Sequence, residues 1–256
     1  MPDPILRRFL GKLPPRRDPR TFKLARYLRD CPPAPEQCFY QQRVHDWGMM
    51  LNDQIGDCVI AAMGHMLEQW TTYADGSPYI PTNQQILDAY RDISGYVLGD
   101  PSTDNGCDLL TSLSYWRKTG LSYHKIAAFA EIHTLEELHQ AVYLFGNAII
   151  GLALPQTAQD QTQWFIDDTD PALSVPGSWG GHCVPIVGYD ENLETCISWG
   201  GKLSMTPNFF RRYSDEAYAV VSADWIEKNA DAGADGKSPS GFDIAQLEAD
   251  LQQITG

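Results

Sequence analysis

The segment Asn52-Asp53-Gln54-Ile55-Gly56-Asp57-Cys58 leads into a run with helical periodicity and places a cysteine where a helix begins. From Cys58, apolar residues recur every three or four positions, which predicts one buried helix face reaching Trp70. Asp57 stands where an N-cap belongs, and Gly56 permits the tight turn before it. Because the N–H groups and dipole at a helix N-terminus lower a thiol pKa, we predict that Cys58 is a thiolate nucleophile.

A histidine far downstream is a candidate partner for this thiol. His182 ends a Gly-Gly-His tripeptide, whose glycines allow close backbone approach, and it opens a β-type run to Tyr189. An imidazole beside the thiolate completes an ion pair and later serves as a general acid. His65 lies seven residues beyond Cys58 on the same predicted helix, roughly 10 Å along its axis, so we interpret it as a packing residue.

The charge of the chain is unevenly distributed. Residues 1–45 carry a net charge of +6, whereas residues 46–256 carry −20. Because phosphate contacts need a basic surface, the acidic body excludes nucleic acid as the main partner. The basic segment contains prolines at positions 14, 15, 32, 33 and 35, which prevent long helices. We therefore expect an extended docking arm over residues 1–45.

Composition also bears on location and cofactors. No stretch approaches the roughly 20 apolar residues of a membrane span, and no apolar segment follows the N-terminal charges as in a secretory signal. We expect a cytoplasmic protein with no membrane partner. The six cysteines lack the spacing of a small disulfide scaffold, which predicts free thiols, with a Cys31–Cys38 bridge as the alternative. Without CxxC or HExxH motifs, we expect no metal and no cofactor.

Two kinds of pattern divide the rest of the chain. Before residue 130 the periodicity is helical, and after it short apolar runs predict strands that follow one capped helix. The expected helices span 83–92, 108–118 and 134–145, and the expected strands span 148–154, 183–189, 194–199 and 217–222. A helical part followed by a strand-rich part, without alternating β-α-β units, predicts an α+β fold.

The order of these segments resembles the papain-like cysteine peptidases, over roughly residues 46–225. The similar segments are Gly56-Asp57-Cys58 with an amide six residues before the cysteine, 106–121, 135–154, Gly181-His182 with 187–189, and Ser198-Trp199-Gly200. The resemblance implies a two-lobed fold with the substrate in a groove between the lobes. The expected boundaries are 1–45 for the arm, 46–130 for the helical lobe, 131–227 for the β-rich lobe, and 228–256 for a linker and a C-terminal helix over 244–254.

The resemblance also implies roles for individual residues. Cys58 would attack an amide carbonyl as a thiolate, and His182 would pair with it and protonate the leaving amine. Asn52, or alternatively Gln54, would hold the oxyanion together with the Cys58 backbone N–H. Gly181, next to the histidine, would contact the substrate.

One position departs from the family pattern. The family has an asparagine immediately before Ser-Trp-Gly that orients the histidine, and this chain has Ile197, whose side chain cannot hydrogen-bond. We expect Ser198, sixteen residues after His182, to orient the ring, in preference to Asp190 in the preceding turn. Trp199 would shield the ring from water.

The whole chain also resembles a set of phage and bacterial proteins. The shared segments include Gly11-Lys12-Leu13-Pro14, Gly-Asp-Cys, Gly-Gly-His, Asp215-Glu216-Ala217 and Gly236-Lys237-Ser238-Pro239. This resemblance implies a phage or prophage origin, with the host wall or a phage protein as the target.

We therefore predict a cysteine hydrolase that cleaves or transfers a peptide, isopeptide or similar amide bond in a protein or cell-wall component. One alternative is a catalytically inactive structural or binding protein, virion-associated, in which Ile197 marks lost catalysis. Another is a peptidoglycan amidase, because such enzymes also carry Asp-Cys at a helix start. In either the active or the inactive case, the arm would dock a partner or block the groove as a propeptide does.

Overall fold

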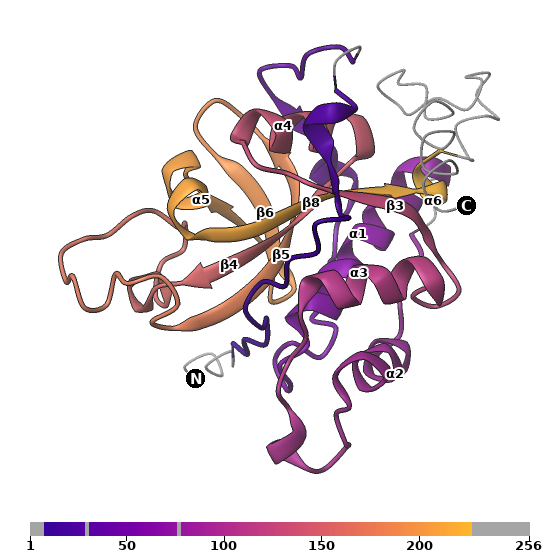
Figure 1. The fold of residues 1–256 in the computed structure, drawn as a ribbon, viewed down its shortest axis with the longest axis vertical. Helices are drawn as coiled ribbons and strands as arrows, with labels where there is room; N and C mark the ends of the chain where they lie inside the picture. The colour runs from indigo at the N-terminus through magenta and orange to yellow at the C-terminus, as the bar shows by residue number, and fades with distance from the viewer. Residues whose placement is uncertain (1–7, 29–30, 76–77, 227–256) are drawn as a thin grey trace.

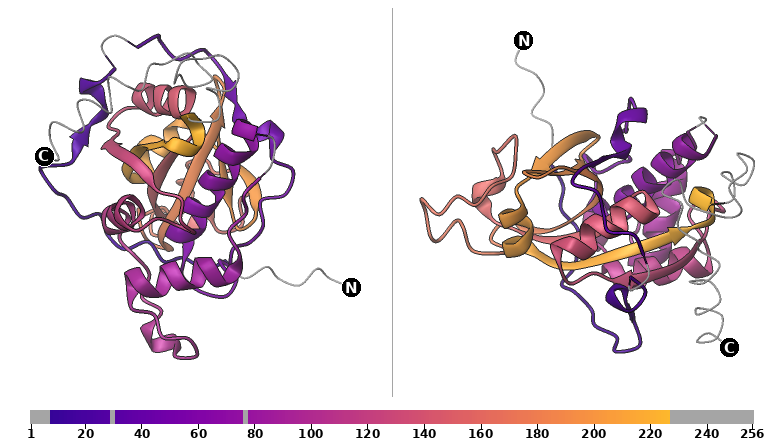
Figure 2. Two further views of the ribbon diagram at one scale, coloured as in Figure 1. Left: turned by 90° about the vertical axis from the view of Figure 1, so that its right-hand side faces the viewer. Right: turned by 90° about the horizontal axis from the view of Figure 1, so that it is seen from above.

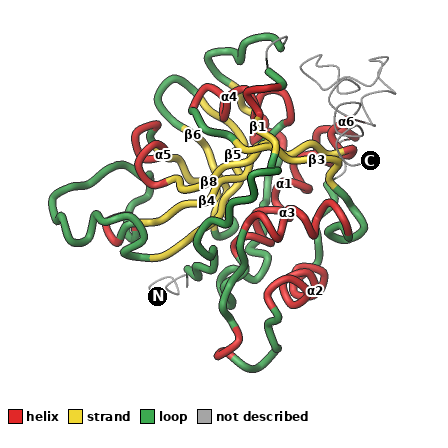
Figure 3. Tube along the Cα trace, in the orientation of Figure 1, coloured by secondary structure: helices red, strands yellow, loops and turns green. Residues whose placement is uncertain are grey.

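The computed structural model describes residues 8–28, 31–75 and 78–226, and it has the predicted α+β fold. Figure 1 and Figure 3 show most of the strands on one side of the molecule and helices α1 to α3 on the other, with the strand labelled β3 extending over the helical side. The helices are α1 (Cys58–Asp75), α2 (Asn83–Ser94), α3 (Leu109–Lys118), α4 (Leu135–Phe145), α5 (Pro207–Tyr213) and α6 (Ala223–Ile226). The predicted linker and helix after residue 227 lie outside the described residues. The domain boundaries stay predictions.

One eight-stranded sheet dominates the strand-rich half. Its strands are β1 (Phe22–Lys23), β2 (Cys38–Phe39), β3 (Ile126–Glu131), β4 (Ala148–Leu154), β5 (Gly180–Tyr189), β6 (Glu194–Ser198), β7 (Gly201–Met205) and β8 (Ser214–Ser222). They are ordered β1-β3-β8-β4-β5-β6-β7, with β2 paired to β5. The pairs are antiparallel except β1 with β3. Strand β5 is therefore central, between β4 and β6.

Within the described residues the predicted helices and strands are present, with shifts of up to three residues at their ends. Thr82 caps α2 by accepting a hydrogen bond from the Gln85 N–H, and Thr134 caps α4 through the Glu137 N–H. Strand β6 ends one residue before the prediction because Trp199 has a positive φ of 47°. Local capping and periodicity therefore decide these elements.

Among the helices and strands of five or more residues, three were not predicted: β3, α5 and β7. Strand β3 reads Ile-Ala-Ala-Phe-Ala-Glu, and alanine has weak strand propensity, so its pairing with β8 decides its structure. Helix α5 is only seven residues long, although Thr206 caps it and Pro207 opens it. Such short elements depend on tertiary contacts that sequence periodicity does not report.

Helix α1 is tied to the end of α4 by side chains. Gln69 Nε2 donates to the Gly146 carbonyl oxygen at 2.8 Å, and Trp70 Nε1 donates to the Phe145 carbonyl oxygen at 2.8 Å. The last carbonyls of a helix have no partner within the helix, so these bonds satisfy them. Both donors are buried, and they fix the helix that carries Cys58 against the end of α4.

The N-terminal arm is extended, as predicted. Over residues 8–28 and 31–45 it contributes only the two-residue strands β1 and β2 and short helical turns, and it wraps across the molecule (Figures 1 and 2). All six cysteines are free thiols, so the alternative Cys31–Cys38 bridge is not formed. No helix in the described ranges is long and apolar enough to cross a bilayer.

We predict that Leu138→Ala lowers the free energy of unfolding by about 2–4 kcal/mol, because Leu138 on α4 is fully buried and the change leaves a cavity. Urea unfolding followed by tryptophan fluorescence measures the effect. Leu98→Ala is the matched control, since Leu98 is 66% exposed, and it should change the value by no more than about 0.5 kcal/mol. Equal losses in the two variants would contradict this assignment of the core.

Candidate active site

Cys58 lies at the first position of α1 and is 1% exposed. Backbone groups of Cys183 and Gly11 hydrogen-bond to its sulfur. Even so, burial raises the pKa of the Cys58 thiol to about 12, and the neighbouring Asp57 acts in the same direction. The prediction of a lowered thiol pKa is thus wrong for this state, because desolvation outweighs the helix terminus and the hydrogen bonds.

Asp57 occupies the predicted N-cap position but does not cap through its side chain. Its carbonyl oxygen accepts the first helical hydrogen bonds, from the Ile60 and Ala61 N–H groups. The carboxyl group is buried, and this burial raises its pKa well above the ordinary range. Burial therefore disfavours the charged form of the carboxyl group beside Cys58.

His182 lies on β5, next to Cys183, whose backbone contacts the Cys58 sulfur. Its Nε2 hydrogen-bonds to Ser198 Oγ at 2.8 Å, whereas its buried Nδ1 has no hydrogen-bond partner. The ring stacks on Trp199, with centroids 4.4 Å apart and planes 11° apart. Burial lowers the pKa of His182 to about 3. The imidazole is therefore neutral, with one nitrogen oriented and the other free.

The two amide candidates for the oxyanion site lie in different surroundings. Asn52 is 2% exposed, and its Nδ2 donates to the carbonyl oxygens of Phe9 at 3.3 Å and Ile55 at 3.4 Å. Gln54 is exposed, and its amide contacts Asp53 at 3.4 Å. The structure brings Asn52, and not Gln54, into the buried cleft.

Three further residues weighed in the sequence lie elsewhere. His65 Nε2 lies 3.1 Å from the Gly48 carbonyl oxygen, and burial lowers its pKa to about 4, as suits a packing residue. Asp190 accepts hydrogen bonds from backbone N–H groups within its own turn. Ile197 is buried in a separate apolar cluster with Trp47. The hydrogen bond and ring contacts of His182 are with Ser198, Trp164 and Trp199, and not with any of these three.

A carboxylate that the sequence analysis missed holds the loop before Cys58. Asp104 accepts hydrogen bonds from the Gly56 N–H at 3.0 and 3.1 Å and from the Tyr90 hydroxyl at 2.5 Å. The Tyr90 oxygen in turn accepts the Gly106 N–H at 3.0 Å. This network joins the α1 turn to the loop after α2. Only the chain path brings Asp104 there, so no local signal could have revealed it.

The N-terminal arm fills the cleft over these residues. The Gly181 carbonyl oxygen accepts hydrogen bonds from the N–H groups of Gly11 at 3.2 Å and Lys12 at 3.0 Å. On the opposite side, the Cys107 N–H donates to Gly11, and the Leu13 N–H donates to Cys107. Figure 1 shows the arm passing between the sheet and α3. Residues 9–13 thus occupy the groove where a substrate peptide was expected.

The aromatic wall of the cleft also holds the arm. Trp199 Nε1 donates to the Phe9 carbonyl oxygen at 3.1 Å, so this oxygen receives bonds from both Trp199 and Asn52. The Arg8 guanidinium lies over the Trp199 ring, 5.1 Å from its centroid. Trp199 therefore contacts both the His182 ring and the arm.

Glycines make this close approach feasible. A methyl group on Gly11 would lie 1.7 Å from the Gly56 carbonyl oxygen, and one on Gly106 would lie 1.9 Å from the Gly11 carbonyl oxygen. One on Gly181 would lie 2.0 Å from the Lys12 carbonyl oxygen. These distances are far inside van der Waals contact, so a side chain at any of the three positions would displace the arm or the wall.

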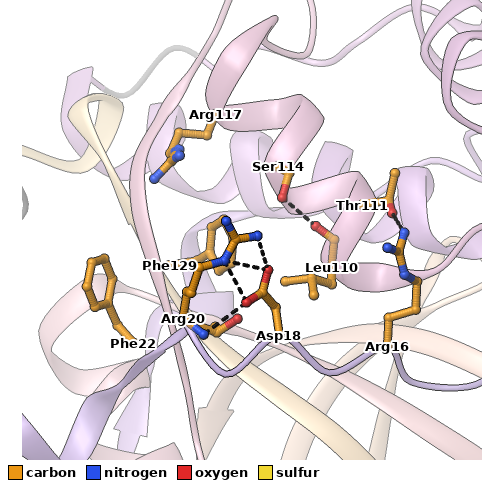
Figure 4. A pocket seen from close by; sticks show the side chains of 10 residues that line it. Arg16, Asp18, Arg20, Phe22, Leu110, Thr111, Ser114, Arg117 and Phe129 are labelled. Carbon is orange, nitrogen blue, oxygen red and sulfur yellow. Dashed lines mark hydrogen bonds and ion pairs between the residues drawn. The ribbon is translucent and has the colours of Figure 1, made fainter. Parts of the chain in front are cut away.

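A separate hollow lies on the outer side of the arm (Figure 4). It is lined by arm residues, among them Arg16 and Arg20, and by α3 residues, among them Leu110 and Arg117. It contains none of the residues around Cys58. Its cations are partly compensated, since Arg20 pairs with Asp18. Among the described residues, no three His, Cys, Asp or Glu side chains form a group that could hold a metal ion.

With this geometry the fold can be compared with known structures: it is the papain-like fold of cysteine proteases. Xylellain, a cysteine protease from Xylella fastidiosa, aligns with 85% of this chain over 98% of its own, at 14% identity and a TM-score of 0.64. The ragweed pollen allergen Amb a 11 in its proform aligns with 77% of this chain over 68% of its own, at 14% identity and a TM-score of 0.55.

A third solved structure is the cysteine protease CMS1MS2 from Carica candamarcensis, in complex with E-64. It aligns with 73% of this chain over 99% of its own, at 15% identity and a TM-score of 0.51. No protein-family model matches the sequence, and a search of curated proteins gives no match. Identities this low establish the fold alone. The resemblance to phage proteins stays a prediction.

We predict that iodoacetamide labels Cys58 slowly in the native protein, because a thiol with a pKa of about 12 is almost entirely protonated near neutral pH and lies beneath the arm. Gly11→Ala should displace the arm and raise the labelling rate roughly tenfold or more. Peptide mass mapping locates the label.

Gly201→Ala is the matched control for this experiment. A methyl group there meets nothing nearer than the Ser198 carbonyl oxygen at 3.9 Å, so labelling should stay slow. Circular dichroism spectra of both variants should match the wild type. Labelling of the wild type as fast as that of Gly11→Ala would show that the arm does not protect Cys58.

Proposed function

We propose that this chain is a cysteine hydrolase that cleaves an amide bond in a peptide or protein, and that the arm keeps it latent. The observation that carries the proposal is the state of His182. Its Nε2 is bound to Ser198, and its buried Nδ1 is left without a partner beside the strand residue that contacts Cys58. A general base that serves a nucleophile needs one nitrogen oriented and the other free.

The chemistry would begin when the arm leaves the cleft. Water entry removes the desolvation that now keeps Cys58 neutral, and the helix N-terminus then favours the thiolate. The same change permits His182 to take the thiol proton through Nδ1, which forms the ion pair. The thiolate would attack the amide carbonyl, and the imidazolium would return the proton to the leaving amine.

Asn52 is suited to stabilise the oxyanion. Its Nδ2 already donates to a peptide carbonyl oxygen, that of Phe9, inside the cleft. A donor fixed in a buried site costs little reorganisation when charge develops on the substrate oxygen. Gln54 is exposed and lacks this arrangement, so we assign the role to Asn52.

Ser198 would orient His182 in place of the asparagine that the resemblance implies. A hydroxyl provides one hydrogen bond at 2.8 Å, and the stacked Trp199 ring limits rotation of the imidazole. Loss of one such bond corresponds to about 1.5 kcal/mol, or roughly tenfold in rate. The substitution at Ile197 is therefore compatible with catalysis.

The test uses the full-length Gly11→Ala protein, in which the cleft is open. We expect hydrolysis of fluorogenic peptide amides, abolished by Cys58→Ser or His182→Ala and reduced roughly tenfold by Ser198→Ala. Alkylation of Cys58 should persist well below the reference thiol pKa of about 8.5, and His182→Ala should remove this reactivity.

Two other results would redirect the assignment. An ordinary thiol profile that is indifferent to His182, with no hydrolysis, would favour the inactive binding protein. Release of fragments from purified peptidoglycan without peptidase activity would favour the amidase. Cytoplasmic or virion-associated location is a separate question, which fractionation of infected and uninfected cells addresses.

A further inference from the structure

The side chain of Lys12 enters a buried acidic pocket beside the cleft. Its Nζ lies 3.1 Å from the Asp215 carboxylate and 3.0 Å from Glu216 Oε1, and it donates to the Leu13 carbonyl oxygen at 2.9 Å. The Lys12 side chain is 1% exposed and that of Glu216 is 5% exposed. A lysine this deeply buried is rare unless it is paired. Burial alone would lower its pKa, but the two carboxylates outweigh that effect and raise it.

The pocket is built to admit a long side chain. A methyl group on Gly151 of β4 would lie 2.4 Å from Lys12 Cε and 2.7 Å from Glu216 Cγ. A glycine inside a central strand weakens the strand, and it often marks a place where another group approaches closely. Gly151 therefore provides the space through which the aliphatic stem passes to the carboxylates.

The pocket also adjoins the candidate catalytic residues. Gly151 pairs with Cys183 across the β4–β5 ladder, and the Cys183 backbone contacts the Cys58 sulfur. The charges of Lys12 and Glu216 both act on the Cys183 thiol. The side chain that fills the pocket therefore belongs to a peptide segment that passes directly over Cys58.

The backbone contacts of this segment carry no sequence preference. Gly181 and Cys107 bind only N–H and carbonyl groups, which any extended peptide provides. The side chain in the pocket is different, because two carboxylates would stay there when the arm leaves. An apolar side chain would leave Glu216 buried without a partner, which is costly, whereas an ammonium or guanidinium group would pair with Glu216 and with Asp215, whose side chain is 28% exposed.

We propose that Glu216 and Asp215 form a specificity pocket that selects a lysine or arginine side chain of the substrate, with Lys12 as its internal occupant while the arm is in place. The proposal rests on the proposed function, since it assigns the substrate class of that same cleft. The ion pairs of Lys12 would also stabilise the bound arm, in addition to its backbone hydrogen bonds.

The first experiment uses the full-length Lys12→Ala protein, and the Gly11→Ala protein as a second background with an open cleft. Fluorogenic peptides carry lysine, arginine, leucine or glutamate at each position in turn. We expect kcat/KM to favour lysine or arginine over leucine at one position by about 100-fold. Removing one partner of a buried ion pair costs about 3 kcal/mol or more, because the other charge stays buried and unpaired.

Glu216→Gln in the same background should reduce this preference at least tenfold, and Glu216→Lys should shift it towards glutamate. Glu191→Gln is the matched control, since Glu191 is an exposed carboxylate in the β5–β6 turn, and it should leave the preference unchanged. Hydrolysis without a basic preference, or with one that Glu216→Gln does not alter, would overturn the specificity pocket while keeping the proposed function.

A binding measurement separates the two proposals if no peptide is hydrolysed. Calorimetry would compare a synthetic peptide of residues 8–15 with the same peptide carrying Lys12→Leu, each added to the Lys12→Ala protein. Tighter binding of the lysine peptide by tenfold or more, lost with Glu216→Gln, would support a pocket selective for basic side chains without catalysis. Equal binding of both peptides would overturn the pocket as well.

Discussion

The arm backbone runs so close to the α1 turn that only glycine fits at Gly11, and this contact excludes water from Cys58 and His182 together. Both groups are consequently neutral, as a raised thiol pKa and a lowered imidazole pKa indicate. The hydrogen bonds of Asn52, Trp199 and Gly181 are all engaged by the arm. The charge state of the candidate site is thus set by a segment that lies more than forty residues before the cysteine.

Strand β5 positions the groups that contact the arm, Ser198 and Cys58. Three consecutive residues serve three purposes: the Gly181 carbonyl holds the arm, the His182 ring meets Ser198, and the Cys183 backbone contacts the Cys58 sulfur. Only His182 acts through its side chain, whereas Gly181 and Cys183 act through backbone groups, so three neighbouring residues can contact three different partners. The strand is central in the sheet and buried, so these positions are held with little freedom.

The sequence predicted the parts of the structure that local patterns control. The start of α1 at Cys58, the β5 run after His182, and the cap at Thr134 follow from periodicity and side-chain chemistry. The thiol pKa was misjudged, because the helix terminus is a local effect and the burial is caused by a distant segment. The Lys12 and Asp215 contact spans 203 positions, and both segments were noted only as motifs. Nothing local links them.

The pairing of Lys12 with Glu216 and Asp215 has one further consequence. If the same two carboxylates hold the arm and choose the substrate, latency and selectivity cannot evolve independently. A substitution in the pocket that lets other substrate side chains bind would also weaken the binding of Lys12. A larger fraction of the protein would then have the arm displaced and the site open. Selection that maintains inhibition by the arm would therefore also maintain the preference for basic substrates, because both depend on the same two carboxylates.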